Sequence, residues 1–434
     1  MNAPDVVDVV ALGESMVTFL PTRAGRLADV PSFDRAIGGA ESNVACGLAA
    51  AGHTVRWVSR VGSDGFGDHL VETIGGYGVD VSAVGRDSSR PTGVYFRTAG
   101  DRATDAHEVA YYRAGSAASA MSVENVDLAS VRAARVLHLS GITAALSSGC
   151  LALLRALMAL GEDRPLVSFD VNHRAGLWRD ADGPRVVLEL ARGADLVFVG
   201  EDEAEEAWGI SGGPSAIRAA LPEPGVLVVK QGGVGATAFV SAAGRRGAAY
   251  RRGPAPLGSD TGPQIQAAAL TPDPKPGGTP QAGLSDTDPR PEGADLAPRP
   301  TEPAGGRVAR GGSGSAGNGP SPAGAGDADP RSATEPGVFV SSLHVDVVAT
   351  TGAGDAFAAG FLSATLRGLP LKTRLRHGHL YAAAALTTPG DLAAPPTRDT
   401  TDRLAAVADD AWGTLRLGPG WTQAGTAPEE VPTP

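Results

Sequence analysis

Residues 350–361 read Thr-Thr-Gly-Ala-Gly-Asp-Ala-Phe-Ala-Ala-Gly-Phe, which puts glycines at positions 352 and 354 and an acid at position 355. Two glycines in a turn let consecutive backbone N–H groups converge on an anion, because no Cβ stands in the way. Residues 356–367 are helix formers with apolar side chains at helical spacing. The turn is therefore predicted to open a helix, whose free amides and positive dipole end favour a phosphate.

Asp355 falls in the first turn of that helix, beside the predicted anion hole. A carboxylate there is poorly placed to bind phosphate, but it is well placed to take a proton from a hydroxyl that attacks one. The pattern predicts phosphoryl transfer to an alcohol, with the amides of Gly352, Ala353 and Gly354 stabilising the transferred group. The competing interpretation is a glycine-rich turn in which Asp355 only caps the helix.

A second motif near the other end of the chain weighs against that simpler interpretation. Residues 38–43 read Gly-Gly-Ala-Glu-Ser-Asn and precede a helix of small residues that ends at Gly52. Paired glycines let a polyhydroxylated ligand approach the backbone. Asn43 offers sugar hydroxyls both a donor and an acceptor.

The two motifs together resemble the signatures of the ribokinase-like (PfkB) family of sugar kinases, which carries one near each end. The segments between them are most similar to its 2-keto-3-deoxygluconate kinases, notably residues 57–67, 91–96, 111–119, 137–143 and 168–174. The resemblance implies ATP- and Mg²⁺-dependent phosphorylation of 2-keto-3-deoxy-D-gluconate at its C6 hydroxyl, giving 2-keto-3-deoxy-6-phosphogluconate. A fructokinase-like enzyme, a 2-keto-3-deoxygalactonate kinase and a catalytically silent sugar-acid sensor stay open as alternatives.

The resemblance also implies the contacts to the sugar acid. Tyr111 and Arg113 share one face of a predicted lid strand, and Arg174 follows a strand at its carboxyl end, where ligands bind in open α/β sheets. A guanidinium suits an acidic substrate because it binds a carboxylate bidentately; an exposed strand with a surface arginine is the alternative. The residues implied to contact the sugar acid are Gly39, Asn43, Tyr95, Tyr111, Arg113 and Arg174.

Residues 230–235 read Lys-Gln-Gly-Gly-Val-Gly and match the family's phosphate-side K-x-G-x-x-G turn, which implies nucleotide contacts for Lys230, Gly232 and Gly235. Residues 200–203 stand where the family has N-x-x-E, but the asparagine is replaced by glycine. Only Glu203 is carried over, as support for the Mg²⁺–phosphate site. Ala349 stands where the family usually has an aspartate that helps to hold a monovalent cation, so we expect little activation by potassium.

Apolar runs bounded by turn residues alternate with helical stretches along the chain. This alternation predicts an α/β fold with a doubly wound, mostly parallel sheet and helices on both faces, as in the ribokinase-like family. The pattern changes to alternating strands with no helix between them at about residues 90–114. We interpret these strands as part of a small β lid, to which the resemblance adds residues 14–36.

Residues 252–337 are rich in proline and glycine and contain no aromatic residue. Such a segment cannot bury enough apolar area to offset its conformational entropy, so we predict a disordered insertion, and a neutral insert is favoured over a regulatory tail. The flanking runs, residues 226–240 and 338–348, both indicate strands that rejoin across it. The predicted kinase domain therefore comprises residues 1–251 and 338–417, followed by a disordered tail at residues 418–434.

Composition excludes several classes of partner. The net charge of −11 leaves no basic stripe for nucleic acid, and no apolar run has the length of a membrane span. Cys46 and Cys150 both lie in apolar surroundings, which fits packing in a reducing cytoplasm. His377 and His379 match no zinc pattern, and a solvated helix is predicted for them. We expect a cytoplasmic homo-oligomer whose partners are a small sugar acid and ATP, with no nucleic acid and no membrane.

Overall fold

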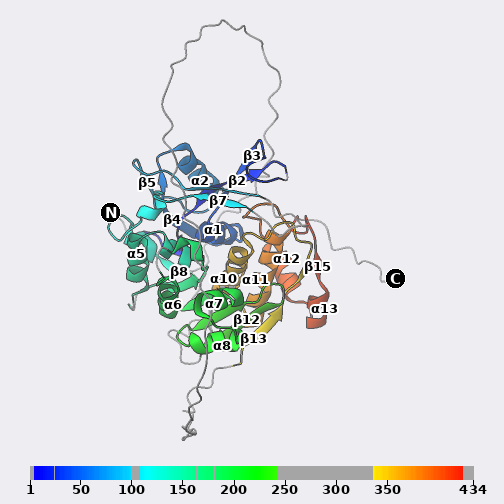
Figure 1. Cartoon of the computed structure of the whole chain (residues 1–434). Coiled ribbons are helices and arrows are strands. Elements are labelled where there is room, and N and C mark those ends of the chain that lie inside the picture. The colour runs from blue at the N-terminus through cyan, green and yellow to red at the C-terminus, as the bar shows by residue number, and fades with distance from the viewer. Residues whose placement is uncertain are drawn as a thin grey trace, which may run out of the picture. The chain divides into compact units, whose positions relative to one another are not determined.

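Short runs of β-branched and aliphatic residues form the seven parallel strands of the central sheet that the structure describes (Figure 1). In spatial order they run β5-β4-β1-β8-β9-β10-β11, so the chain builds outward on both sides of β1. This is the doubly wound arrangement that the sequence predicts. The strands are β1 Val7–Leu12, β4 Val55–Gly62, β5 Val84–Asp87, β8 Ala134–Ser140, β9 Leu166–Asp170, β10 Leu196–Gly200 and β11 Val226–Lys230.

The computed structural model describes most of the chain outside the proline- and glycine-rich segment. The described residues are 4–23, 25–98, 108–159, 161, 164–178, 181–241 and 336–423. The predicted insertion at residues 252–337 therefore lies almost wholly outside the described residues.

Two antiparallel strands extend the sheet beyond β11. They are β12 (Gly235–Val240) and β13 (Val338–Ser341), and Ala238 pairs with Val338. The prediction that the sheet rejoins across the insertion is therefore confirmed.

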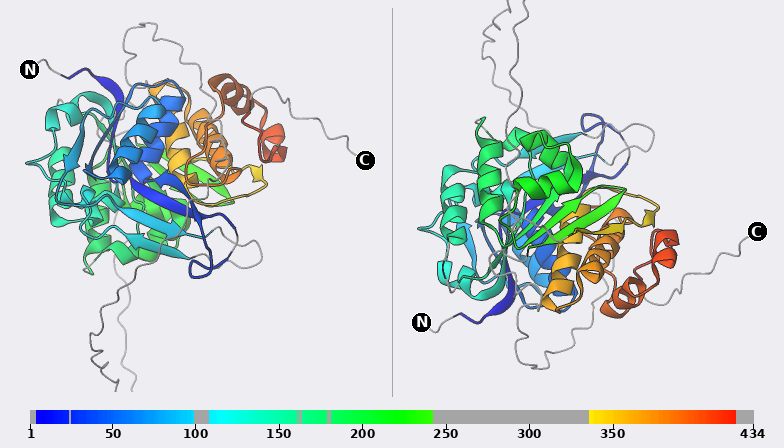
Figure 2. Two further views of the ribbon diagram at one scale, coloured as in Figure 1. Left: turned by 90° about the horizontal axis from the view of Figure 1, so that it is seen from above. Right: turned by 90° about the horizontal axis from the view of Figure 1, so that it is seen from below.

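Helices cover both faces of the sheet (Figure 2). The alternation of side chains along a strand explains how both faces become apolar: in β1, Val9 and Ala11 belong to one core cluster, and Val10 and Leu12 to the other. The first layer holds α1 Ala40–Ala50, α2 Gly65–Gly76, α10 Ala353–Leu366, α11 Leu371–Leu386, α12 Arg398–Ala405 and α13 Asp409–Thr414. The second holds α3 Leu128–Arg132, α4 Gly141–Ala145, α5 Ser148–Met158, α6 Gly183–Gly193, α7 Glu201–Trp208 and α8 Gly213–Ala220.

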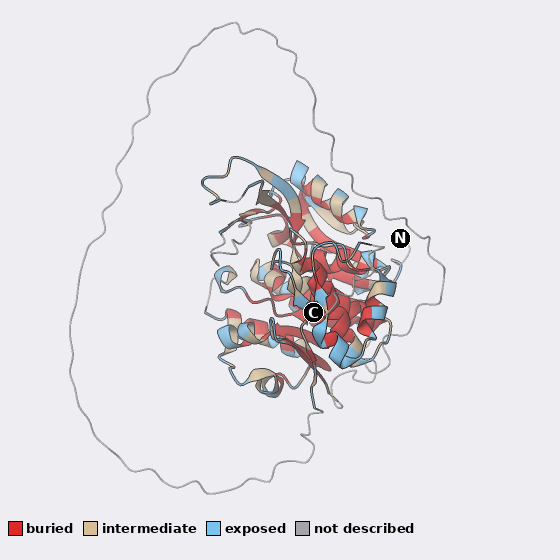
Figure 3. Ribbon diagram, turned by 90° about the vertical axis from the view of Figure 1, so that its right-hand side faces the viewer, coloured by how far each residue is buried: buried red, intermediate tan, exposed pale blue. Residues whose placement is uncertain are grey.

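Buried residues concentrate in the central sheet and on the inward faces of its helices (Figure 3). Cys46 and Cys150 are both buried and free, as expected for packing residues. The prediction of a solvated helix for His377 and His379 was wrong, because α11 is packed from more than one side. His379 lies within hydrogen-bond distance of the Val340 carbonyl, and burial lowers the pKa of both imidazoles to about 4.

A second sheet of four strands corresponds to the predicted lid. Its order is β3-β2-β6-β7, with antiparallel pairing except between β2 and β6. The strands are β2 Met16–Pro21, β3 Phe33–Gly38, β6 Val94–Arg97 and β7 Val109–Tyr112. We call this second sheet the small sheet.

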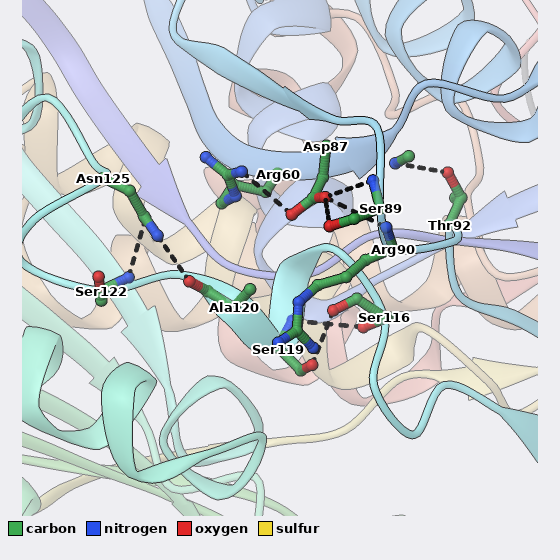
Figure 4. A network of polar contacts seen from close by, with 11 residues as sticks. Arg60, Asp87, Ser89, Arg90, Thr92, Ser116, Ser119, Ala120, Ser122 and Asn125 are labelled. Carbon is green, nitrogen blue, oxygen red and sulfur yellow. Dashed lines mark hydrogen bonds and ion pairs between the residues drawn. The ribbon is translucent and has the colours of Figure 1, made fainter.

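Polar side chains fix the segments that join the small sheet to the central sheet (Figure 4). Asp87, the last residue of β5, accepts hydrogen bonds from the Ser89 and Arg90 backbone amides and pairs with Arg60 at 3.1 Å. The Thr92 hydroxyl accepts from the Gly62 amide at 2.9 Å. The small sheet is therefore anchored at its base by hydrogen bonds from the central sheet.

The described chain ends beyond the helices at Gln423. Two short strands, β14 (His344–Val345) and β15 (Arg416–Leu417), pair in parallel. Trp421 packs against the core after them. The rest of the predicted tail, residues 424–434, lies outside the described residues.

Candidate active site

A cavity of about 970 Å³ opens at the carboxyl ends of the parallel strands, between the central sheet and the small sheet. Asp170 and Lys230 end β9 and β11 there. Ligands bind at this edge in open α/β sheets because the connections diverge at the point where strand order reverses. In this chain that point lies at β1, which has β4 on one side and β8 on the other.

The predicted glycine turn forms one wall of the cavity. Gly352 caps α10 with φ 79°, in the left-handed region where a side chain is strained. A Cβ at this position would also collide with the carbonyl oxygen of Asp391. Because α10 begins at Ala353, its first amides have no partner within the helix and face the turn. The geometry fits the predicted anion hole.

Asp355 lies half-buried in the first turn of α10, and its side chain lines the cavity. The Asn43 amide nitrogen donates to its Oδ2 at 2.9 Å. Burial raises the pKa of the Asp355 carboxyl to about 7. The Asn43 hydrogen bond and the charge of Lys230 oppose that rise in pKa, whereas the charges of Asp170 and Glu41 add to it. A carboxyl with this proton affinity is suited to accept a proton near neutral pH.

Lys230 brings a positive charge beside the glycine turn. Its ammonium lies 3.1 Å from both carboxylate oxygens of Asp170, and a Cβ on Gly354 would be 3.5 Å from the same nitrogen. Burial lowers the pKa of Lys230, but the neighbouring carboxylates, Asp170 foremost, outweigh it and raise the pKa. The lysine is therefore charged and held toward the anion hole.

Arg174 and Glu203 lie together at the same edge. The Arg174 side chain is 56% exposed and approaches Glu203 Oε1 at 3.5 Å. Glu203 Oε2 accepts from the Gly200 amide at 2.7 Å, which holds the carboxylate at the start of α7. No cluster of three or more metal-ligating side chains occurs among the described residues. A single carboxylate nevertheless fits a Mg²⁺ ion that is bound mainly by phosphates and water.

The small sheet contributes an aromatic and cationic wall. Tyr95 and Tyr111 pair across β6 and β7 with ring centroids 5.5 Å apart, and the Arg113 guanidinium lies 5.9 Å from the Tyr111 ring centre. Arg113 also forms an ion pair with Glu14, whose other oxygen accepts from Ser116 at 2.6 Å. The charge of Arg113 is thus already compensated, whereas Arg174 remains accessible.

Most of the residues selected from the sequence line this one cavity: Gly39, Asn43, Tyr95, Tyr111, Arg113, Arg174, Glu203, Lys230, Gly352, Gly354 and Asp355. Ala353, Gly232 and Gly235 are not among its lining residues. Gly232, at φ 54°, belongs to the hairpin turn between β11 and β12. Gly235 has φ 153°, and a Cβ there would collide with the Val340 carbonyl, so backbone conformation and packing both require glycine at this position.

Several polar side chains in the cavity lining or directly behind it were not selected from the sequence. Asp170 and Asn172 follow the apolar run of β9, so their place at a strand's carboxyl end could have identified them. Asp391 contacts both the Tyr95 hydroxyl and Arg97, and Glu14 pairs with Arg113. No local pattern marks these last two, because their partners lie in distant segments.

The arrangement can transfer a phosphoryl group to an alcohol, which is the chemistry of a kinase. Residues 7–252 and 332–398 match the family described as pfkB family carbohydrate kinase. The chain therefore belongs to the pfkB family of carbohydrate kinases and is a sugar kinase.

Proteins similar to this chain are also named as sugar or sugar-acid kinases. A 2-dehydro-3-deoxygluconokinase of Thermoproteus tenax is 34% identical over 241 residues, which is 55% of this chain and 73% of that protein. A 2-dehydro-3-deoxygluconokinase of Bacillus subtilis is 28% identical over 400 residues, 91% of this chain and 94% of that protein. The crystal structure of a Pyrococcus horikoshii sugar kinase in complex with ATP shares the fold. Its TM-score is 0.61 at 20% identity, over 90% of this chain and 96% of that chain.

None of the helices in the described part of the chain combines the length and the apolar character needed to cross a membrane.

Proposed function

We propose that this sugar kinase transfers the γ-phosphoryl group of ATP to the C6 hydroxyl of 2-keto-3-deoxy-D-gluconate. The observation that carries the proposal is Asp355, a carboxyl with pKa about 7 that faces the cavity in the first turn of α10, beside the left-handed Gly352 turn. The names of the two relatives described above support the choice of sugar acid.

In the proposed reaction Asp355 accepts the proton of the C6 hydroxyl while the C6 oxygen of the sugar acid bonds to the γ-phosphorus of ATP. The bond between that phosphorus and the bridging oxygen breaks, and ADP leaves with the electron pair. The amides of Gly352, Ala353 and Gly354 would stabilise the charge on the transferring group. The small sheet would act as a lid that keeps water out of the cavity.

We assign Lys230 to the phosphates, since its charge is held beside the glycine turn by Asp170. Glu203 would help to hold Mg²⁺, which neutralises phosphate charge when bound. Gly232 and Gly235 would serve the nucleotide through the turn that follows Lys230.

The sugar acid would occupy the side of the cavity formed by the small sheet. Arg174, which follows β9 at the edge of the central sheet, is the most exposed cation of the described cavity lining, and it favours a carboxylate over the neutral substrate of a fructokinase. The other proposed contacts are Gly39, Tyr95, Tyr111 and Arg113. The 2-keto-3-deoxygalactonate epimer differs in the orientation of one hydroxyl and is the second candidate substrate.

A coupled ADP-release assay across 2-keto-3-deoxygluconate, its galacto epimer, gluconate, fructose and ribose tests the proposal. We expect the highest kcat/KM for 2-keto-3-deoxygluconate, with ³¹P NMR showing a phosphate ester at C6. A kcat/KM for fructose equal to or above that for the sugar acids would contradict it.

We further propose that the protein acts in the cytoplasm as a homo-oligomer. Two free, buried cysteines are compatible with a reducing compartment. An exposed aromatic side chain on the small sheet, Tyr112, offers apolar area for contact between copies.

A further inference from the structure

The side-chain amide of Asn43 donates a hydrogen bond to a carboxylate of the same chain. The residue is 6% exposed, and its Nδ2 donates to Asp355 Oδ2 at 2.9 Å. Its Oδ1 is buried and has no hydrogen-bond partner among the described residues. Asp355 therefore already engages one of the two N–H donors that a sugar hydroxyl could have used.

The packing of two helices creates this contact. Asn43 lies in the first turn of α1, and Asp355 lies in the first turn of α10. Between the two helices a Cβ at Gly47 would be 3.0 Å from the Ala359 Cβ, so only small residues permit the close approach. The contact is thus set by the core and does not depend on a flexible loop.

We infer that Asn43 is a positioning residue for Asp355. The side-chain amide of Asn43 fixes Oδ2 of Asp355 and leaves Oδ1 of Asp355 for the acceptor hydroxyl. The inference rests on the proposed function of Asp355 as the base. An amide nitrogen can only donate, so its bond to the carboxyl favours the ionised form that accepts a proton.

The other charged groups that face Asp355 come from three elements. Asp170 at the end of β9 and Glu41 in α1 disfavour the ionised form, whereas Lys230 at the end of β11 favours it. Asn43 supplies the hydrogen bond within this set. Its removal should therefore leave Asp355 more basic and less well oriented.

The first test needs no substrate. The ¹³C carboxyl signal of Asp355, assigned by its loss in Asp355→Asn, is titrated in the wild type, in Asn43→Ala and in the exposed control Asn125→Ala. We expect the pKa of Asp355 to rise by about one unit or more in Asn43→Ala, the scale of a hydrogen bond to a charged group. It should be unchanged in the control. An unchanged pKa in Asn43→Ala would overturn the inference.

The second test separates positioning from sugar binding. Asn43→Ala should lower kcat at pH 7 at least tenfold and move the acid limb of the pH profile upward, and Asn43→Gln should restore part of kcat. In the Asp355→Asn background, Asn43→Ala should change the calorimetric Kd for 2-keto-3-deoxygluconate less than twofold. A tenfold weaker Kd in that background with unchanged kcat in the single variant would make Asn43 a sugar contact and overturn the inference.

If Asn43→Ala does not fold, Asn43→Ser, which cannot reach the carboxylate as the amide does, is used for both measurements with the same criteria. If the wild type phosphorylates no sugar acid, the proposed function fails, and the titration still decides whether Asn43 acts on Asp355.

Discussion

Asp355 combines two requirements that oppose each other. The carboxyl must be ionised to accept a proton, yet burial and two neighbouring carboxylates favour its neutral form. Lys230 and Asn43 offset part of that cost, so the pKa remains about 7 and does not rise further.

A pH dependence follows from this balance. Only ionised Asp355 can act as the base, so kcat/KM should rise with pH through about 7 and then level off. At pH 5 about one molecule in a hundred has the ionised carboxylate, and kcat/KM should fall to about that fraction. Initial rates between pH 5 and 9 at constant ionic strength measure this pH dependence of kcat/KM. A profile that is flat from pH 5 to 7 would show that no group of this kind limits the rate.

Arg174 is expected to bind the substrate carboxylate, because its side chain is 56% exposed and approaches Glu203 at 3.5 Å, whereas the Arg113 side chain is largely buried in an ion pair with Glu14. A charge-assisted hydrogen bond contributes about 1.5–3 kcal/mol, so Arg174→Ala should raise KM for the sugar acid roughly 10- to 150-fold. The matched control is Arg185→Ala, another exposed arginine that pairs with a nearby acid in its own segment. An equal rise in KM for the sugar acid and for a neutral sugar would show that Arg174 does not bind the substrate carboxylate.

Residue types and spacing alone predicted Asp355 and its glycine turn, since both features are local. The partners of the polar residues could not be predicted in that way. No local feature of the sequence indicates that the Asn43 amide bonds Asp355 across two helices. Nor does any local feature indicate that Arg113 pairs with Glu14, which comes from a distant part of the chain.

Among the secondary-structure elements, the contact between helices α10 and α11 depends on glycines. A Cβ at Gly360 in α10 would collide with the His377 carbonyl of α11, and a Cβ at Gly378 would lie 2.8 Å from the Phe357 ring. A helix backbone cannot move away as a flexible side chain can, so α10 and α11 approach closely only through these glycines.

Gly360→Ala should therefore destabilise the protein by about 1–3 kcal/mol, the usual range for overpacking. Gly76→Ala is the control, because its added methyl group would contact nothing and alanine favours a helix. Urea unfolding measures both variants, and we expect opposite signs. Equal stability of Gly360→Ala and the wild type would show that the interface between α10 and α11 relaxes.

Strands and helices were predicted well because each is a local pattern, and the parallel strands of the sheet carry nearly continuous apolar runs. The error at His377 and His379 has a clear cause. Their helix has weak amphipathic character, so the sequence does not reveal that β13 and α12 cover it on different sides.

In the whole molecule, the central sheet continues from β12 to β13, although the long proline- and glycine-rich segment separates these strands in the sequence. β12 and β13 are antiparallel neighbours, so a short turn can join the end of one to the start of the other. Replacing residues 253–335 with a short turn should leave folding, Tm and kcat/KM close to those of the full chain.

Circular dichroism, thermal melts and ADP-release rates on both proteins check that prediction. Insoluble protein, or a kcat/KM changed more than about threefold, would show that the segment contributes to folding or to the site.

The central claim is that the cavity transfers a phosphoryl group to a sugar acid with Asp355 as the base. ADP release with 2-keto-3-deoxygluconate by the wild type and by Asp355→Asn, with sugar-acid binding measured by calorimetry on both, tests it most directly. The account predicts a kcat lower by about two to four orders of magnitude in Asp355→Asn, with Kd within a few-fold of the wild type. Turnover by Asp355→Asn above a tenth of the wild-type value would contradict it.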